Sequence, residues 1–183
     1  MLCLRAGMKL LVVGDFHGIF PREICSLVKK EKIDGVVSNG DYLPFAFRKL
    51  WFKHCYGKDV GLWEIIGKKK YKKLIRKEIH EGERVLKALN DLPVPIISVY
   101  GNLERSMRED TMDSPQSRGT AYWNFEWKDH FTPLVRKYHN IHHITYVSYR
   151  IGEYVFIGAY GSSSPGRVKS KAYRKSRKKL DAL

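Results

Sequence analysis

Three short segments of this chain place potential metal ligands directly after apolar runs. They are residues 14–18 (GDFHG), with Asp15 and His17, residues 39–41 (NGD), with Asp41, and residues 101–104 (GNLE), with Asn102. Carboxylate oxygens and imidazole nitrogens are ligands that Mn, Fe and Zn accept in proteins. Each segment also contains a glycine, and Gly18 removes a side chain that would crowd an ion. The three segments together predict a metal site.

The apolar run before each segment predicts a β-strand that ends where the segment begins. We expect strands over residues 9–14, 36–38 and 96–100, and a helix over residues 22–31 between the first two strands. This is a β-α-β-α-β start, and its first crossover is expected to be right-handed. Ligands of open α/β sheets bind at the carboxyl ends of the strands. The sheet would therefore bring the three segments to one edge.

A simpler alternative is that Asp15 and Asp41 only cap the helices that follow them, since Asp is a favoured N-cap residue. A D-x-H spacing taken alone also occurs by chance. The coincidence of suitable ligands at three strand ends favours the metal site over helix capping.

The pattern GD-x-HG, GD and GN-x-E resembles the calcineurin-like metallophosphoesterase superfamily over residues 9–166. The resemblance implies an α/β, metallophosphoesterase-like two-sheet core with flanking helices and a dinuclear metal centre at the strand ends. It implies that Asp15 and His17 bind the first metal and that Asp41 bridges both. It also implies that Asn102 binds the second metal and contacts the substrate phosphate, and that Glu104 fills the family's acidic catalytic position.

The chain departs from that family in two places. Leu103 stands where the family commonly has a histidine that protonates the leaving group or orients the phosphate. The family's later strand ending in His, and its Gly-His-x-His strand end, have no counterpart, so the C-terminal strands are expected to be missing. His139, His142 and His143 are poor replacements, and we expect them at the surface or in a hairpin.

The expected chemistry is hydrolysis of a phosphate mono- or diester through a metal-bound hydroxide, which two adjacent divalent ions would activate and orient. The predicted cofactors are divalent ions (Mn, Fe, Zn or Ni). The first site has three protein donors, whereas the second has only Asp41 and Asn102, so an incomplete active site is expected. The substrate class and the choice of metal stay open. A truncated sheet would leave an open edge, where a homodimer or a complementing chain could bind.

The rest of the sequence predicts one domain over residues 8–166 with an aromatic insertion at 44–67. The insertion is interpreted either as a lid over the site or as a small satellite core. We expect helices over 68–90 and 123–138, and a hairpin with strands over 144–149 and 154–158. A basic helix over 167–183 would close the chain.

The chain has 183 residues, three cysteines and a net charge of +15. Its apolar runs fall well short of the roughly 20 residues that span a membrane, and a reduced, cytoplasmic setting without membrane contact is expected. The positive charge favours anionic partners: a phosphorylated substrate, and nucleic acid as a further option. Two alternatives to an active phosphoesterase remain. One is a catalytically degenerate binding or regulatory protein, and the other is a basic nucleic-acid-binding protein that uses the lysines at 68–77 and the tail at 167–179.

Overall fold

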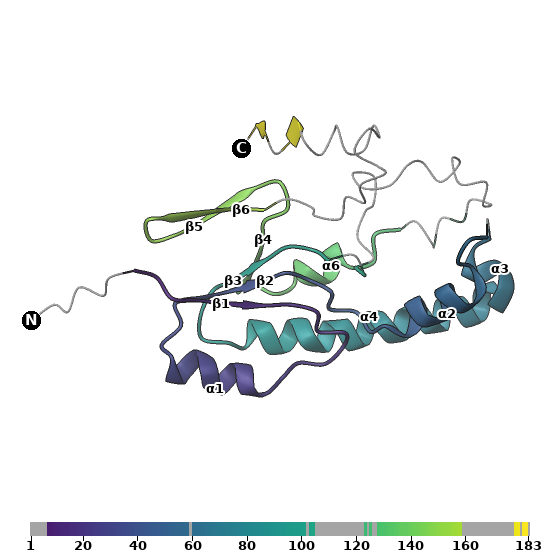
Figure 1. Cartoon of the computed structure of the whole chain (residues 1–183), viewed down its shortest axis with the longest axis horizontal. Coiled ribbons are helices and arrows are strands. Elements are labelled where there is room, and N and C mark those ends of the chain that lie inside the picture. The colour runs from purple at the N-terminus through teal and green to yellow at the C-terminus, as the bar shows by residue number, and fades with distance from the viewer. Residues whose placement is uncertain are drawn as a thin grey trace, which may run out of the picture.

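A computed structural model of the chain describes residues 7–58, 60–101, 103–104, 123, 125, 128–158, 178–179 and 181–182. Four parallel strands form one sheet in chain order (Figure 1). The strands are β1 (Leu10–Val13), β2 (Gly35–Ser38), β3 (Ile96–Ser98) and β4 (Ile141–His143). The α/β class and the three predicted strands that precede the motif segments are confirmed.

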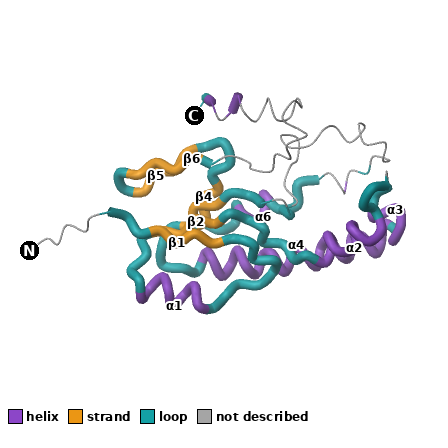
Figure 2. Tube along the Cα trace, in the orientation of Figure 1, coloured by secondary structure: helices purple, strands orange, loops and turns teal. Residues whose placement is uncertain are grey.

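Helical crossovers connect these strands (Figure 2). The helix α1 (Glu23–Lys30) joins β1 to β2, as predicted. Between β2 and β3 the chain forms α2 (Ala46–His54), α3 (Leu62–Ile66) and α4 (Lys68–Asn90). The short helix α6 (Thr132–Val135) precedes β4.

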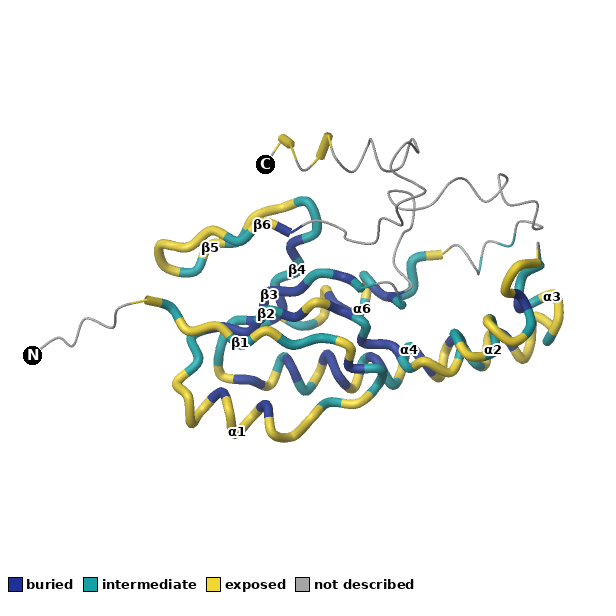
Figure 3. Tube along the Cα trace, viewed as in Figure 1, coloured by how far each residue is buried: buried dark blue, intermediate teal, exposed yellow. Residues whose placement is uncertain are grey.

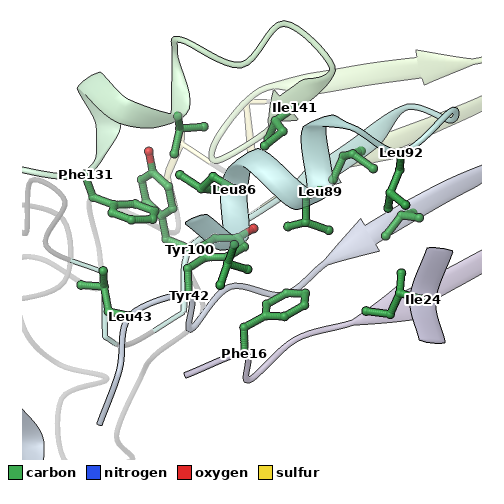
Figure 4. Packing of buried hydrophobic residues seen from close by; sticks show 14 of the residues in the cluster. Phe16, Ile24, Tyr42, Leu43, Leu86, Leu89, Leu92, Tyr100, Phe131 and Ile141 are labelled. Carbon is green, nitrogen blue, oxygen red and sulfur yellow. The ribbon is translucent and has the colours of Figure 1, made fainter. Parts of the chain in front are cut away.

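The main apolar core lies between the sheet and the helices α1 and α4 (Figure 4). Ile24 and Val28 are one helical turn apart on α1, and Val85 and Leu89 repeat that spacing on α4, so each helix turns one apolar face inward. Gly82 allows α4 to approach the chain after β2, because an added Cβ would lie 2.6 Å from Leu43 Cδ2. The core therefore holds the loops after β1 and β2 against α4.

The predicted hairpin is present as β5 (Ser148–Ile151) and β6 (Tyr154–Ile157), an antiparallel pair separate from the main sheet. It lies on the opposite side of the sheet from α1 in Figure 1. Its first strand begins at Ser148 rather than at residue 144 and continues to Ile151. Gly152, with a φ of +58°, takes the left-handed conformation in the tight turn.

The later chain differs from the sequence analysis in two places. Residues 141–143 form the fourth parallel strand, which the sequence analysis did not anticipate. The expected helix over 123–138 is reduced, within the described residues after 127, to α6. Pro133 fixes this start because it has no N–H to donate inside a helix, and the Asp129 carboxylate accepts from the N–H groups of Phe131 and Thr132 at 3.1 and 2.9 Å.

The aromatic insertion contributes to a second apolar cluster, as the satellite-core interpretation expects, but Phe45, Phe52 and Tyr56 stay exposed. Cys55, Leu62, Tyr71 and Ile75 are its buried centre. The N-terminal part of α4 packs in this second cluster while the C-terminal part packs in the main core, so one helix links both. Glu78 on α4 is buried, and its carboxylate accepts from the Phe47 N–H in the first turn of α2 at 2.5 Å.

Most of the expected basic helix over 167–183 lies outside the described residues. Lys179 is described, and its ammonium lies 4.9 Å from the centre of the Tyr146 ring. Among the described residues, no helix has the length and apolar character needed to span a bilayer.

Candidate metal centre at the strand ends

The loops after β1 and β2 are joined by backbone hydrogen bonds that continue the strand pairing past the end of the sheet. The N–H groups of Asp15 and His17 donate to the carbonyls of Gly40 and Asp41 at 3.1 and 2.9 Å. The next contact, from Gly18 N–H to the Tyr42 carbonyl, is 2.9 Å long. The first two predicted motifs are thus brought side by side, as the sequence analysis expected.

Three of the predicted ligands have a backbone conformation that non-glycine residues rarely adopt. Asp15, His17 and Asp41 have φ angles of +53°, +47° and +55°. The left-handed region costs a non-glycine residue about 1–2 kcal/mol, because Cβ crowds the carbonyl oxygen. Such strain is concentrated at functional sites, where the surrounding structure maintains it. Its coincidence on these three residues supports a functional role for the strand ends.

The helix-capping alternative is excluded by where the helices begin. The N-cap residue of α1 is Arg22 and that of α2 is Phe45, and neither N-cap makes a side-chain capping hydrogen bond. Asp15 and Asp41 therefore stand several residues before the helices that they were alternatively expected to cap.

Glu104 ties the second motif to the third. Its side chain is fully buried, and its carboxylate accepts three backbone N–H groups, from Asp41 at 3.1 Å, Tyr42 at 2.6 Å and Gly101 at 2.6 Å. In return, the Leu103 N–H donates to Asp41 Oδ1 at 2.9 Å. These contacts make Glu104 a positioning residue for the loop that carries Asp41, while its predicted catalytic role stays a prediction.

Two glycines permit this close approach. An added Cβ at Gly40, which has a φ of +86°, would overlap the backbone nitrogen of Gly101. An added Cβ at Gly101 would overlap the Asp41 carboxylate. The glycines in the NGD and GNLE segments therefore serve loop packing, a reason the sequence pattern alone did not reveal.

Burial sets the protonation of Glu104. Desolvation raises the pKa of its carboxyl to about 7, and the neighbouring Asp41 charge acts in the same direction. The three N–H donors favour the charged form and oppose the rise. Because its pKa in the folded chain lies above that in the unfolded chain, this group contributes stability at low pH, and the contribution is lost as the pH rises through about 7.

A buried tyrosine links β2 and β3 beside the candidate site. The Tyr42 hydroxyl lies 2.7 Å from the hydroxyls of both Ser38 on β2 and Ser98 on β3. Its ring stacks between Phe16 and Phe131, with centroid distances of 5.7 and 5.6 Å. Burial raises the pKa of Tyr42, so the hydroxyl remains protonated and can donate to one serine while it accepts from the other.

The donor side chains are only partly assembled. His17 Nε2 lies 3.8 Å from Asp15 Oδ1, and His17 Nδ1 is buried without a hydrogen-bond partner among the described residues. Asp41 Oδ1 accepts from the Leu103 N–H, which leaves Oδ2 and a second lone pair of Oδ1 for an ion. Within the described part of the chain, no three His, Cys, Asp or Glu side chains form a group that could hold an ion. Asn102 lies outside the described residues.

No protein-family model, curated protein or solved structure matches this chain. The case for a metal centre therefore depends on the residues themselves. Carboxylate and imidazole groups such as those of Asp15, His17 and Asp41 are donor types that suit Mn, Fe or Zn. The described side chains do not gather into a group of three, and Asp41 is the one described candidate ligand of the second predicted metal.

The sequence analysis misplaced His143. We expected a surface or hairpin residue, but His143 ends β4 and is paired with Ser98, at the same edge of the sheet as the predicted ligands. Its ring stacks on Tyr100 with centroids 3.7 Å apart, and its Nδ1 is buried without a hydrogen-bond partner among the described residues. His142 instead contacts the hairpin, with Nε2 2.8 Å from the Tyr149 hydroxyl.

We expect His143 to make the fold less stable in acid. Burial lowers the pKa of its imidazole to about 4, opposed by the Ser98 backbone and the Asp129 charge. The unfolded chain takes up this proton near pH 6.5, so the contribution of His143 to stability is present above that pH and declines toward pH 4. The slope is at most about 1.4 kcal/mol per pH unit.

The measurement is urea unfolding of the wild type and of His143→Phe, which keeps a ring against Tyr100 but cannot titrate. The free energy of unfolding of the wild type minus that of His143→Phe should decrease as the pH falls from 6.5 to 4. Titration of Glu104 has the opposite sign and cancels in the difference. Identical pH profiles would refute the assignment.

Proposed function

We propose that this chain is a metal-dependent phosphoesterase with a metallophosphoesterase-like fold. One observation carries the proposal: Asp15, His17 and Asp41 all have left-handed backbones at the carboxyl ends of two neighbouring parallel strands, whose loops are hydrogen-bonded to each other. The motif pattern GD-x-HG, GD and GN-x-E supports the same reading. Divalent ions would supply Lewis-acid activation of water and neutralise charge on the phosphate.

In such a site, different residues would bind the metal ions and position the loops. Asp15 and His17 would hold the first ion, with Asp41 as the ligand shared with a second ion, and Asn102 as a ligand of that second ion and a phosphate contact. Glu104 fixes the Asp41 loop through three N–H groups. Leu103 packs against the main core and has no proton to give to a leaving group, so an ester with a good leaving group is the best test substrate.

The test uses the full chain, stripped of metal, with bis-p-nitrophenyl phosphate and p-nitrophenyl phosphate. We expect Mn²⁺ to restore hydrolysis and His17→Asn to lower the rate by about 100-fold, since it removes an imidazole donor but keeps a side chain that tolerates positive φ. His80→Asn, on an exposed position of α4, should act like the wild type. Hydrolysis that is independent of metal, or unaffected by His17→Asn, would overturn the proposal.

A catalytically degenerate member of the same fold is the second candidate. It is favoured by Leu103 at the position of the family's acid and by the lack of a three-ligand group among the described residues. Calorimetric titration with Mn²⁺ separates the two candidates. Metal binding that depends on His17 without turnover of either ester would support the degenerate protein, whereas metal-dependent turnover would exclude it.

A further inference from the structure

The second apolar cluster belongs to an arm, which we define as α2, α3 and the first part of α4, residues 46–77. Figure 1 shows these helices extending beyond the end of the sheet, and Figure 3 shows that much of their surface is exposed. The arm has its own buried centre and is not needed to cover the main core. Its surface chemistry is therefore free to serve a partner.

The arm carries a large part of the positive charge of the chain. Residues 46–77 contain eleven lysine and arginine residues and two acidic ones, in a chain with a net charge of +15. Lys69, Lys70 and Lys73 are exposed in the first turns of α4, and the first turn contains no acidic residue. Cations at this end of a helix oppose the helix dipole. Helix stability therefore does not explain the lysines, whereas binding of a polyanion does.

Exposed aromatic rings accompany these charges. Phe52 and Tyr56 are 44% and 67% exposed, and their ring centroids are 5.4 Å apart. The Arg48 guanidinium lies 5.1 Å from the Phe52 ring centre. A cation beside exposed rings is the arrangement by which proteins bind single-stranded nucleic acid, where phosphates meet cations and bases stack on rings.

The base of the arm touches the candidate metal centre. Phe45, which directly precedes α2, packs edge-on against His17 with ring centroids 5.6 Å apart. The connection from Asp41 to α2 is only four residues long. A single-stranded nucleic acid that lies along the arm toward the sheet would reach the ends of β1 and β2, which carry the predicted ligands.

We infer that the arm binds a single-stranded nucleic acid, with its lysines on the phosphates and Phe52 and Tyr56 against the bases. An anionic membrane fits the charge equally well but fits the exposed side chains less well. The large exposed apolar side chains described within the arm are Phe52, Tyr56 and Ile65, which is an aromatic pair rather than an aliphatic stripe. The inference is independent of hydrolysis; if the proposed phosphoesterase activity holds, the bound strand is its phosphodiester substrate.

The first test measures the anisotropy of a fluorescent 20-nucleotide oligothymidylate bound to the full chain, from 50 to 300 mM KCl. Replacing Lys69, Lys70 and Lys73 by Gln should weaken binding at least tenfold at low salt. It should also lower the slope of log K against log [salt] by about 2, at about 0.7 per phosphate contact. The matched control removes three exposed lysines elsewhere: Lys29 and Lys30 on α1 and Lys87 near the end of α4. Equal losses in both variants would overturn the inference.

The second test separates stacking from charge. Tyr56→Ala should weaken binding about tenfold with an unchanged salt slope, whereas Tyr154→Ala, which removes an exposed ring from β6, should have no effect. Wild-type affinity in Tyr56→Ala would also refute the inference, as would binding to phosphatidylserine vesicles without binding to the oligonucleotide. Oligonucleotide binding is measured without added metal and hydrolysis of bis-p-nitrophenyl phosphate with Mn²⁺, so loss of binding and loss of hydrolysis can be told apart.

Discussion

Glu104→Ala is expected to destabilise the fold by about 3–5 kcal/mol. The substitution leaves the buried N–H groups of Asp41, Tyr42 and Gly101 without their acceptor. A buried donor without a partner costs about 1–3 kcal/mol, although water that enters the space would recover part of this cost. Because the carboxylate joins two strand-end loops, we expect the loss in overall stability and not only in local order. Urea unfolding at pH 8, monitored by circular dichroism, would measure it.

Two variants frame that result. Glu104→Gln keeps one oxygen acceptor and should lose about half as much stability, because its NH₂ group must face at least one backbone N–H. Glu153→Ala removes an exposed carboxylate in the turn of the hairpin and should change stability by less than about 0.5 kcal/mol. If Glu104→Ala unfolds within about 1 kcal/mol of the wild type, the three hydrogen bonds do not hold the loops together.

Asp41→Asn is expected to reduce metal-dependent ester hydrolysis by at least about 100-fold while the protein stays folded. An amide oxygen can still accept from the Leu103 N–H, and Asn tolerates the φ of +55° at this position. The variant therefore removes the negative charge but keeps the local contacts. Loss of a group that stabilises charge in the reaction costs about 10²–10³ in rate.

The comparison that decides the role of Asp41 uses both rate and stability. Its unfolding midpoint should match that of the wild type, and the exposed Asp91→Asn at the end of α4 should match the wild type in rate as well. A variant at Asp41 that retains most of its metal-dependent rate would remove this residue from the reaction. Parallel losses of stability and rate would instead assign it a structural role.

The sequence was informative where the local pattern and the tertiary role agree. The apolar runs of β1, β2 and β3 are short and bounded by glycine and polar residues, so both the strands and the motifs at their ends could be predicted. The helix α4 was equally clear, because Ile75, Val85 and Leu89 keep helical spacing and Pro93 ends the pattern.

The features that escaped prediction depend on contacts between distant residues. The strand β4 contains two histidines in three residues, so its apolar signal is weak. The strand forms because it pairs with β3. The three N–H groups that Glu104 accepts come partly from a segment about 60 residues away, and no spacing rule indicates such a contact. The link between Tyr42, Ser38 and Ser98 likewise spans two strands and has no sequence signature.

The single helix shared by the two apolar clusters has a geometric consequence. At about 1.5 Å per residue, the 23 residues of α4 extend about 34 Å, so the length of this helix sets the distance between the arm and the sheet. Two turns added in its middle would move the arm outward by about 10 Å with little change in its orientation. A single added residue would instead rotate the arm by about 100° around the helix axis. Because only four residues join Asp41 to α2, a change in the length of α4 would also displace the strand end that carries Asp41.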